Sequence, residues 1–477
     1  MSIPPADLPT DLTHADAHFQ PGFSLVSPTD VVVLGAARSG LAAAFFLKDR
    51  AYNVFLSDAG VIDEVTCQQL RDREIPFEQQ GHTEAFLTQA RFMVASPGIP
   101  LTAKPYQWAA AAQIPVVSEV ELAWQFLQQS SRPPRVVAVT GSNGKSTVVS
   151  LLEVVLKQAG FSAAACGNIG LPMIHCVERH EHQPFDFLIL EISSFQLETT
   201  YSLRPDFAFL LNLYENHLDR HGAMDTYFAL KSRLFRRQQA GDLAILSGEN
   251  PWCQRLGEHL SHTAQGPQVR FFCTGDHVQG EQLYYQEQPL MAVSSLCLQG
   301  QHNLENIAAV LLFSAALELP GTLLSEILAT FQGMPHRLEP AGHWQDRLFI
   351  NDSKSTNYLA AEKALASMSR PVIWIAGGQD KGGDFSALGA WVKQKVKHTV
   401  LMGASQDIFS RALIQSGYNQ ITRVNGMEAA IRAAIEQSEP GDVILLSPAT
   451  ASYDAYANFE ARGDHFKHHV AQFISES

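Results

Sequence analysis

The sequence predicts an α/β protein built from three domains in series, and three observations support this prediction. The chain has 477 residues, whereas a single domain usually runs to ~100–200 residues. Its composition (46% hydrophobic, 17% charged, 32 Gly and 24 Pro) is that of a globular protein and excludes a disordered chain or a fibre. Short β-branched runs alternate with helical patterns, which indicates parallel sheets with helices on their faces.

The first predicted domain spans residues 30–130 and follows a polar, proline-rich stretch, 1–29, that we expect to be a flexible extension. A β-branched run that ends in Gly35 opens onto a helical pattern, and further apolar runs follow it. This alternation predicts a Rossmann-like domain. The sequence QQSSRPP then breaks the pattern and is typical of a linker. These elements are expected at 31–34, 53–56 and 92–95 (strands), 41–49 (helix) and 128–134 (linker).

Two more α/β domains are expected at 131–335 and 336–477. The central domain begins with a strand that leads directly into a glycine-rich turn and a helix, which favours a P-loop-type ATPase fold. In the C-terminal domain each strand is followed by a helical segment, so a second Rossmann-like domain is expected. The strands are predicted at 136–140, 187–192 and 207–213, and near 348–350, 372–376, 400–402 and 443–446.

The charge balance restricts the partners of the protein. With 34 Lys+Arg against 48 Asp+Glu, the formal net charge is −14, whereas a general binder of nucleic acid or anionic membranes would carry a positive charge. We therefore expect no nucleic-acid partner, and we expect anions to bind only in local pockets. No uncharged apolar run approaches the about 18 residues of a membrane span, so no membrane insertion is expected.

Cysteine usage and the start of the chain both predict a cytoplasmic protein. The six cysteines show neither a C-x-x-C pair nor zinc spacing, so they are expected to be reduced thiols. The first basic residue is Arg38, and several aspartates precede it. The basic start of a secretory signal and the arginines of a transit peptide are therefore both missing.

The glycine-rich run TGSNGKST at 140–147, between an expected strand and an expected helix, carries the strongest chemical signal. Its glycines allow consecutive backbone N–H groups to point at phosphate oxygens, and the helix N-terminus adds a favourable dipole. Lys145 can reach the β- and γ-phosphates, and the Ser146 hydroxyl can bind Mg²⁺. The residues expected to bind the phosphates are Gly141, Ser142, Asn143, Gly144, Lys145, Ser146 and Thr147.

This run is a shortened form of the P-loop, G-x-x-G-K-[ST], because Val139 stands where the full pattern has glycine. The alternative interpretation is a glycine-rich turn that contains a lysine by chance. The strand–turn–helix context favours phosphate binding.

Three further residues have two interpretations when only residue type is considered. Glu191 closes an apolar strand, where it could hold Mg²⁺ beside a nucleotide triphosphate or be solvated. His217 also follows an apolar strand, and a lone histidine is more often structural. Lys231, in a helical pattern, would by default be a solvated lysine.

The run GAARSG at 35–40 resembles a dinucleotide-binding turn, with Asp58 at the end of the next strand. Ala37, however, occupies the position where such a turn needs glycine so that the backbone can approach a pyrophosphate. The residues therefore disfavour NAD as a ligand.

Several motifs occur in an order that resembles the Mur ligases of peptidoglycan synthesis. They are TGSNGKST, EISSFQLE, NLYENHLDRH, Lys231, GQHN, GMPHRLE, NDSKSTN and SPATASYDAYANFEARGDHF. The resemblance runs from residue 31 to the C-terminus, and this combination is much more specific than the P-loop alone. EISSFQLE, NDSKSTN and the final block are most similar to the family member that adds D-glutamate.

The resemblance implies a catalytic set composed of Lys145, His217, Lys231 and Arg337. It also implies ATP and two Mg²⁺ ions as cofactors, with Ser146 and Glu191 on the first ion. His217 and a carbamylated Lys231 would hold the second. Carbamylation makes chemical sense because it turns a cation that repels Mg²⁺ into an oxygen ligand. Contacts to the nucleotide base, γ-phosphate and ribose are implied for Asn303, Asn306, Arg337 and Asp352.

The substrates implied by the resemblance are UDP-N-acetylmuramoyl-L-alanine and D-glutamate. The uridylated substrate would contact Arg38, Ser39, Asp58, Ser96, Gly98, Asn168 and Ser193. D-Glutamate would contact Lys354, Thr356, Lys381, Ser452 and Phe459. The sequence departs from the family at Thr450 and Cys166, where relatives often have Cys and Gly, and Ala59-Gly60 lacks a basic residue near the expected uracil site.

The implied activity is an ATP-dependent, amide-bond-forming ligation that passes through an acyl phosphate and releases ADP and phosphate. A monomer is expected. Three alternatives stay open. A sibling ligase or a folylpolyglutamate-type synthetase would add a different amino acid. A P-loop kinase would use Lys145 and Glu191 but needs no third domain. A nucleotide-sensing protein without catalysis would need only the first two domains.

Overall fold

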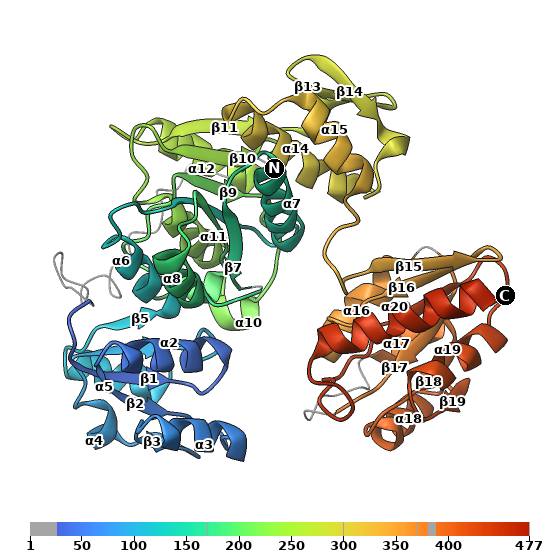
Figure 1. The fold of residues 1–477 in the computed structure, drawn as a ribbon, viewed down its shortest axis with the longest axis horizontal. Coiled ribbons are helices and arrows are strands. Elements are labelled where there is room, and N and C mark those ends of the chain that lie inside the picture. The colour runs from blue at the N-terminus through green and yellow to red at the C-terminus, as the bar shows by residue number, and fades with distance from the viewer. Residues whose placement is uncertain (1–25, 169, 299, 369, 380–387, 477) are drawn as a thin grey trace. The chain divides into compact units, whose positions relative to one another are not determined.

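The computed structural model describes residues 26–168, 170–298, 300–368, 370–379 and 388–476. Most of the expected N-terminal extension and the candidate residue Lys381 lie outside these ranges. The chain forms two compact units, Met1–Phe331 and Gln332–Ser477. Figure 1 shows that sheets flanked by helices make up both units.

The first sheet contains five parallel strands in the order β3-β2-β1-β4-β5. Its central strand is a β-branched run buried on both faces, as expected of a parallel sheet between helices. Because the strand order reverses between β1 and β4, a crevice is expected at the carboxyl ends of these strands. The bounds are β1(Asp30–Leu34), β2(Asn53–Ser57), β3(Phe77–Glu78), β4(Phe92–Ala95) and β5(Val116–Ser118), with helices α2(Arg38–Asp49), α3(Glu64–Asp72), α4(Glu84–Leu87), α5(Lys104–Ala111) and α6(Glu119–Leu127).

The second sheet contains six parallel strands in the order β11-β10-β9-β6-β8-β7. The strands are β6(Arg135–Thr140), β7(Ala163–Gly167), β8(Phe187–Glu191), β9(Phe207–Leu210), β10(Leu243–Ser247) and β11(Gln268–Phe272). The main helices are α7(Lys145–Gln158), α8(Met173–His182), α9(Ser194–Leu197), α10(Leu218–His221), α11(Met224–Ser232), α12(Pro251–Ser261), α14(Gln301–Ala316) and α15(Gly321–Thr330). A short helix, α13(Thr274–His277), precedes a small antiparallel sheet of β12(Val278–Gln279), β13(Gln282–Tyr285) and β14(Gln288–Ala292).

One hydrophobic core joins these two sheets. Phe46 and Leu122, on helices of the first sheet, belong to the same buried cluster as Met173 and Leu188 of the second. Polar contacts strengthen the junction, since Glu121 of α6 accepts hydrogen bonds from the backbone N–H groups of Tyr201 (2.8 Å) and Ser202 (2.9 Å). The two sheets are therefore packed as one body.

The second unit contains a six-stranded sheet in the order β15-β16-β20-β17-β18-β19. All pairs are parallel except β15 with β16, and one apolar cluster covers each face. The strands are β15(Glu339–Trp344), β16(Arg347–Asn351), β17(Val372–Ala376), β18(Val396–Leu401), β19(Ile421–Arg423) and β20(Val443–Leu446). The helices are α16(Tyr358–Ser367), α17(Gly389–Lys395), α18(Gln406–Gln415), α19(Met427–Glu436) and α20(Phe459–Glu476).

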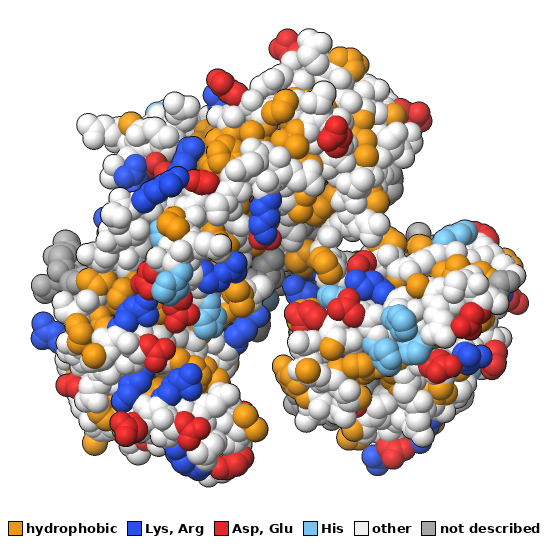
Figure 2. All heavy atoms as spheres, viewed as in Figure 1, with side chains coloured by type: hydrophobic (Ala, Val, Ile, Leu, Met, Phe, Trp, Pro, Cys, Tyr) orange, Lys and Arg blue, Asp and Glu red, His pale blue; other side chains and the backbone are white. Residues whose placement is uncertain are grey.

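The surface carries charges of both signs. On the face drawn in Figure 2, acidic and basic side chains are interspersed, and no continuous basic surface is visible on that face. Among the helices that the structure describes, none is both long enough and apolar enough to cross a membrane.

Candidate active site

The glycine-rich loop joins the buried strand β6 to helix α7, as the sequence predicts. Gly144 is the N-cap of α7 and has φ +83°, and a Cβ atom there would lie 2.2 Å from Oδ1 of Asn306. Any other residue would be strained at this φ and would push the Asn306 side chain away from the loop. The Lys145 ammonium group donates to the carbonyl oxygens of Gly141 (2.8 Å) and Ser142 (3.0 Å), so the side chain folds back over the loop.

Other elements hold the loop from two sides. Asn212, just after β9, accepts hydrogen bonds from the backbone N–H groups of Ser142 through its carbonyl oxygen (3.0 Å) and of Asn143 through Oδ1 (2.9 Å). On the other side lie Asn303 and Asn306, both buried on α14 and joined by a hydrogen bond of 3.3 Å. The structure thus brings Asn306, predicted to contact the nucleotide, against the loop predicted to bind the phosphates.

A hydroxyl and a carboxylate that could bind a metal ion lie together at the start of α7. The Ser146 hydroxyl donates to Oε2 of Glu191 (2.7 Å), and Nδ2 of Asn168 donates to Oε1 of the same carboxylate (2.7 Å). Glu191 is 1% exposed at the end of β8, so its interpretation as a solvated residue is wrong. A hydroxyl and a buried carboxylate form the kind of oxygen pair that Mg²⁺ accepts in nucleotide sites.

The Lys231 side chain is a buried cation beside the glycine-rich loop. It is 1% exposed on α11, and its ammonium group donates to Oγ1 of Thr140 (3.1 Å) and the carbonyl oxygen of Gly141 (3.0 Å). The interpretation of Lys231 as a solvated helix lysine is therefore wrong. Burial holds the pKa of Lys231 well below its usual value, repulsion by Lys145 lowers the pKa further, and Glu191 opposes both effects.

His217 begins the short helix α10 in a left-handed conformation, with φ +55°. Its exposed ring contacts Phe195 edge-on, with 4.9 Å between the ring centroids. His217 follows β9, the neighbour of β6 in the sheet, so it lies on the same carboxyl edge as the glycine-rich loop.

The turn after β1 is packed against the turn after β4. Gly35 has φ +94°, and a Cβ atom there would lie 2.7 Å from Oγ of Ser96. The Asp58 carboxylate accepts the backbone N–H groups of Ala36 (2.5 Å) and Gly60 (2.7 Å). Oγ of Ser96 is buried and has no hydrogen-bond partner in the part of the chain that the structure describes.

This turn also reaches the second sheet. Nη2 of Arg38, in the first turn of α2 beside Ser39, donates to the carbonyl oxygen of Asn168 (3.3 Å). The hydroxyl of Ser193 is used locally, because it caps α9 through Gln196. The structure therefore joins Arg38 and Asn168, two residues predicted to contact the uridylated substrate, with Glu191 of the predicted metal site.

Arg220 lies in the motif NLYENHLDRH but was not among the predicted site residues. It forms an ion pair with Glu198 (2.5 Å), and its guanidinium group donates to the carbonyl oxygens of Ile99 (2.8 Å) and Gly98 (3.3 Å). It therefore ties the turn that carries Ser96 and Gly98 to the central sheet. No local pattern could reveal the contacts to Ile99 and Gly98, since these residues are more than a hundred positions away in the sequence.

In the second unit, the predicted nucleotide residue Asp352 is buried at the end of β16. Its carboxylate accepts hydrogen bonds from the hydroxyls of Ser355 (2.5 Å) and Ser447 (2.7 Å) and from the backbone N–H of Leu338 (3.2 Å). Burial raises the pKa of Asp352 to about 6, although these hydrogen bonds and Arg337 oppose the increase.

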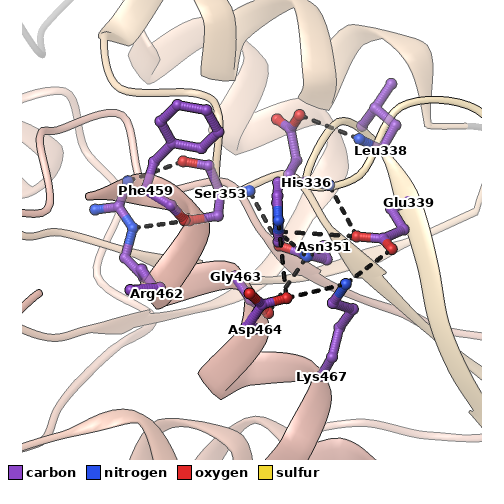
Figure 3. Close-up of polar contacts among 12 residues, drawn as sticks. His336, Leu338, Glu339, Asn351, Ser353, Phe459, Arg462, Gly463, Asp464 and Lys467 are labelled. Carbon is purple, nitrogen blue, oxygen red and sulfur yellow. Dashed lines mark hydrogen bonds and ion pairs between the residues drawn. The ribbon is translucent and has the colours of Figure 1, made fainter. Parts of the chain in front are cut away.

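The residues predicted to contact D-glutamate surround a second buried cation. Arg462 is 1% exposed, and its guanidinium group donates to Ser353 Oγ (3.0 Å) and to the backbone carbonyl oxygens of Ser353 (2.9 Å), Thr450 (3.1 Å) and Ala451 (3.1 Å). Figure 3 shows Arg462 beside Ser353 and Phe459. The loops joined in this way carry Lys354, Thr356, Ser452 and Phe459. Arg462 lies in the final motif block but was not among the predicted site residues.

Family models match three segments of the chain. The N-terminal domain of the MurD-like Mur ligases matches residues 29–118, the Mur ligase middle domain matches 139–314, and the glutamate ligase domain of Mur ligases matches 336–450. The chain belongs to the Mur ligase family. The resemblance inferred from the motifs is thereby confirmed.

Named Mur ligases resemble this chain over almost its whole length. The UDP-N-acetylmuramoylalanine–D-glutamate ligase of Pelotomaculum thermopropionicum is 38% identical over 449 residues, which cover 92% of this chain and 96% of the relative. The ligase of the same name from Geobacillus kaustophilus is 38% identical over 447 residues, covering 91% and 96%.

A solved Mur ligase structure supports the fold. The UDP-N-acetylmuramate–alanine ligase of Thermotoga maritima aligns with a TM-score of 0.52 at 16% identity, covering 94% of this chain and 100% of the other. The predicted α/β class with parallel sheets is confirmed.

Proposed function

We propose that this Mur ligase joins D-glutamate to UDP-N-acetylmuramoyl-L-alanine, with conversion of ATP to ADP and phosphate, in the synthesis of peptidoglycan precursors. The observation that carries the proposal is the 38% identity, over nearly the full length of both chains, to ligases named for this reaction. The reaction makes an amide bond, so the protein is a ligase. Its proposed setting is the cytoplasm, as a monomer without a nucleic-acid partner.

The chemistry needs an activated carboxylate, because a free carboxylate is a poor acylating agent. In the proposed reaction, a carboxylate oxygen of the substrate's alanine attacks the γ-phosphorus of ATP, ADP leaves, and an acyl phosphate forms. The amine of D-glutamate then attacks the acyl carbon, and phosphate leaves as the amine loses a proton. Both nucleophiles come from the substrates, so the chain needs no Ser/His/Asp or Cys/His nucleophile.

The role proposed for the first unit is to hold the phosphates and offset their charge. Residues 141–147 would cradle the phosphates through backbone N–H groups, and the Lys145 ammonium group would rotate from its own loop carbonyls to the phosphate oxygens. Ser146 and Glu191, already paired at 2.7 Å, fit the oxygen-donor chemistry of Mg²⁺. When bound, this ion would offset negative charge on the transferred phosphoryl group.

Lys231 is proposed to be carbamylated and, with His217, to hold a second Mg²⁺. Only a neutral amine attacks CO₂, and burial favours the neutral form of Lys231. Nζ would form a bond to the carbon of CO₂ and lose a proton. Lys231 now contacts Oγ1 of Thr140 and the carbonyl oxygen of Gly141, so the proposed carbamate would lie beside the glycine-rich loop.

Each of the three predicted domains has a proposed substrate. Residues 30–130 would bind the uridylated substrate, for which the buried Oγ of Ser96 and the Arg38–Asn168 contact provide polar groups. Residues 131–335 would bind ATP, together with Arg337 and Asp352 from the C-terminal domain. Residues 336–477 would bind D-glutamate, whose two carboxylates need paired partners when water is excluded.

The test is phosphate release from ATP in the presence of UDP-N-acetylmuramoyl-L-alanine, with each amino acid added separately. Release that depends on D-glutamate, with formation of the ligated product, supports the proposal. Release that depends on another amino acid would identify a sibling ligase instead. If the stable product is the phosphorylated uridylated substrate, with no amino acid attached, the protein is a kinase.

A further inference from the structure

A strained turn carries Arg337, the residue proposed to contact the γ-phosphate of ATP. His336 and Leu338, on either side of it, have left-handed backbone conformations with φ +63° and φ +45°. For residues other than glycine this conformation costs of order 1–3 kcal/mol, and it persists only where the surroundings enforce it. The structure must therefore contain groups that hold this turn.

The backbone of the turn is held on both sides of Arg337. The N–H group of His336 donates to Oε2 of Glu339 (2.8 Å), and its carbonyl oxygen accepts the N–H of Lys354 (2.9 Å). The N–H group of Leu338 donates to Oδ1 of Asp352 (3.2 Å). The peptide groups that flank Arg337 are thus bound to fixed partners.

Glu339 is the centre of this network, as Figure 3 shows. It is 8% exposed at the start of β15. Besides the N–H of His336, its carboxylate accepts Nδ2 of Asn351 (2.9 Å) on Oε2 and the Lys467 ammonium group (3.1 Å) on Oε1. Each oxygen of this buried carboxylate therefore has a donor, as burial of a charge requires.

The side chain of His336 is fixed as well. Nδ2 of Asn351 lies 3.0 Å from Nδ1 of His336, so the ring accepts at Nδ1, and its Nε2–H side faces Asp464 at 3.8 Å. Helix α20 approaches so closely that a Cβ atom on Gly463 would lie 2.1 Å from Nδ1 of His336. Both the backbone and the ring of His336 are therefore immobilised.

We propose that Glu339 is a positioning residue that acts through Arg337. By holding the left-handed turn, it fixes the direction in which the Arg337 guanidinium group meets the nucleotide phosphates. This inference rests on the proposed function, in which ATP is the substrate that Arg337 contacts. A purely stabilising carboxylate would affect all substrates equally, whereas a positioning residue affects the substrate that Arg337 binds.

The experiment uses the full chain with Glu339→Gln, which keeps the size of the side chain but replaces an accepting oxygen with a donating NH₂ group. The NH₂ group must face either the donors at Oε2, which are the N–H of His336 and Nδ2 of Asn351, or the Lys467 ammonium group at Oε1, so the network that holds the turn loses at least one contact. We expect the KM for ATP to rise and kcat to fall, each roughly tenfold, since misplacement of a contact by about 1 Å can cost 10²-fold. The KM for D-glutamate should change less than about twofold.

A double-mutant cycle tests whether the effect passes through Arg337. In an Arg337→Lys background, which retains a cation, Glu339→Gln should change kcat/KM for ATP by less than about twofold, because residues that act together are not additive. Binding of a non-hydrolysable ATP analogue should weaken in parallel. The matched control is Glu428→Gln, an exposed glutamate paired with Arg432 at 3.0 Å.

A milder variant, Lys467→Met, removes only the donor to Oε1 of Glu339. It should raise the KM for ATP by about threefold without unfolding the protein. The inference is overturned if both variants keep their KM for ATP and kcat within about twofold of wild type. It is also overturned if the effects of Glu339→Gln and Arg337→Lys are additive. Wild-type protein that releases no phosphate with D-glutamate would refute the proposed function instead.

Discussion

The Ser146 hydroxyl donates a 2.7 Å hydrogen bond to Oε2 of Glu191, so the start of α7 and the end of β8 meet at one pair of oxygens. We expect Glu191→Gln to raise the Mg²⁺ concentration for half-maximal activity by roughly tenfold or more, because a neutral amide is a weaker ligand for a hard cation. Initial rates at a series of Mg²⁺ concentrations measure this change. Glu258→Gln, which changes an exposed glutamate, is the control, and equal Mg²⁺ requirements in both variants would contradict the assignment.

Lys145→Ala should abolish turnover and leave the fold intact. The ammonium group now donates to loop carbonyls, and its loss removes the cation nearest to the expected phosphates. We expect kcat to fall ~10²-fold or more, by analogy with the removal of a single electrostatic donor. Circular dichroism and steady-state kinetics check both parts, and a variant with more than half of the wild-type kcat would refute the role.

If Lys231 is carbamylated, activity should depend on dissolved CO₂. Exhaustive degassing at mildly acidic pH should lower activity, and bicarbonate should restore it, since carbamates lose CO₂ reversibly. Mass spectrometry under gentle conditions should detect one added CO₂ that is absent from a Lys231→Arg variant. A fully active enzyme whose Lys231 carries no added mass would refute the modification.

Glu119 should make the stability of the first unit depend on pH. Its Oε1 accepts the N–H of Ile174 (2.6 Å) at the start of α8, and burial raises the pKa of Glu119 from 4.5 to about 7. The folded protein therefore holds a proton that the unfolded chain releases above pH 4.5. Stability should fall as pH rises from about 4.5 to 7 and then stay level, a loss on the order of 3 kcal/mol.

Glu119→Gln isolates this effect, because the amide oxygen can still accept the N–H of Ile174 but the side chain cannot ionise. Urea unfolding of both proteins between pH 4.5 and 8 measures it. The unfolding free energy of wild type minus that of the variant should decrease with pH. A constant difference would show that Glu119 does not titrate in this range.

Selection of the amino acid should depend on Lys381, which the family resemblance assigns to D-glutamate. Lys381→Ala should raise the KM for D-glutamate steeply and leave the binding of ATP and of the uridylated substrate little changed, since one carboxylate loses its cation. Acyl-phosphate formation and ligation are measured separately. A KM for D-glutamate within about twofold of wild type would place the pocket elsewhere.

The sequence predicted the parts of the site whose signals are local. The glycine-rich loop and Glu191 each follow an apolar strand, and the carboxyl ends of parallel strands meet at one edge. The roles of Arg220 and Arg462 could not be predicted, because each binds backbone carbonyl oxygens of a segment more than a hundred residues away, and a carbonyl oxygen carries no side-chain signature. Lys231 looked like an ordinary helix lysine, since its burial follows from packing against β6 and the loop.

The fold was predicted least well where periodicity is weak. Strand β15 contains Pro340 and Gly342 and lacks a β-branched run, so the antiparallel edge of the last sheet was not expected. The predicted strand 207–213 is shorter in the structure, where β9 ends at Leu210. Leu211 and Leu213, which follow β9, are buried although they lie outside the strand, so the apolar run continues beyond the end of β9.

The core shared by the first two sheets limits where this chain can be divided to build chimaeric proteins. Cutting after residue 130 would expose Phe46 and Leu122 on one fragment and Met173 and Leu188 on the other, since all four belong to one buried cluster. Among the residues that the structure describes, the apolar clusters of the C-terminal unit contain only residues of that unit. Chimaeras with a junction near residue 331 should therefore stay soluble and folded, whereas grafts of residues 30–130 onto a foreign protein should aggregate unless the facing helix α8 is transferred with them.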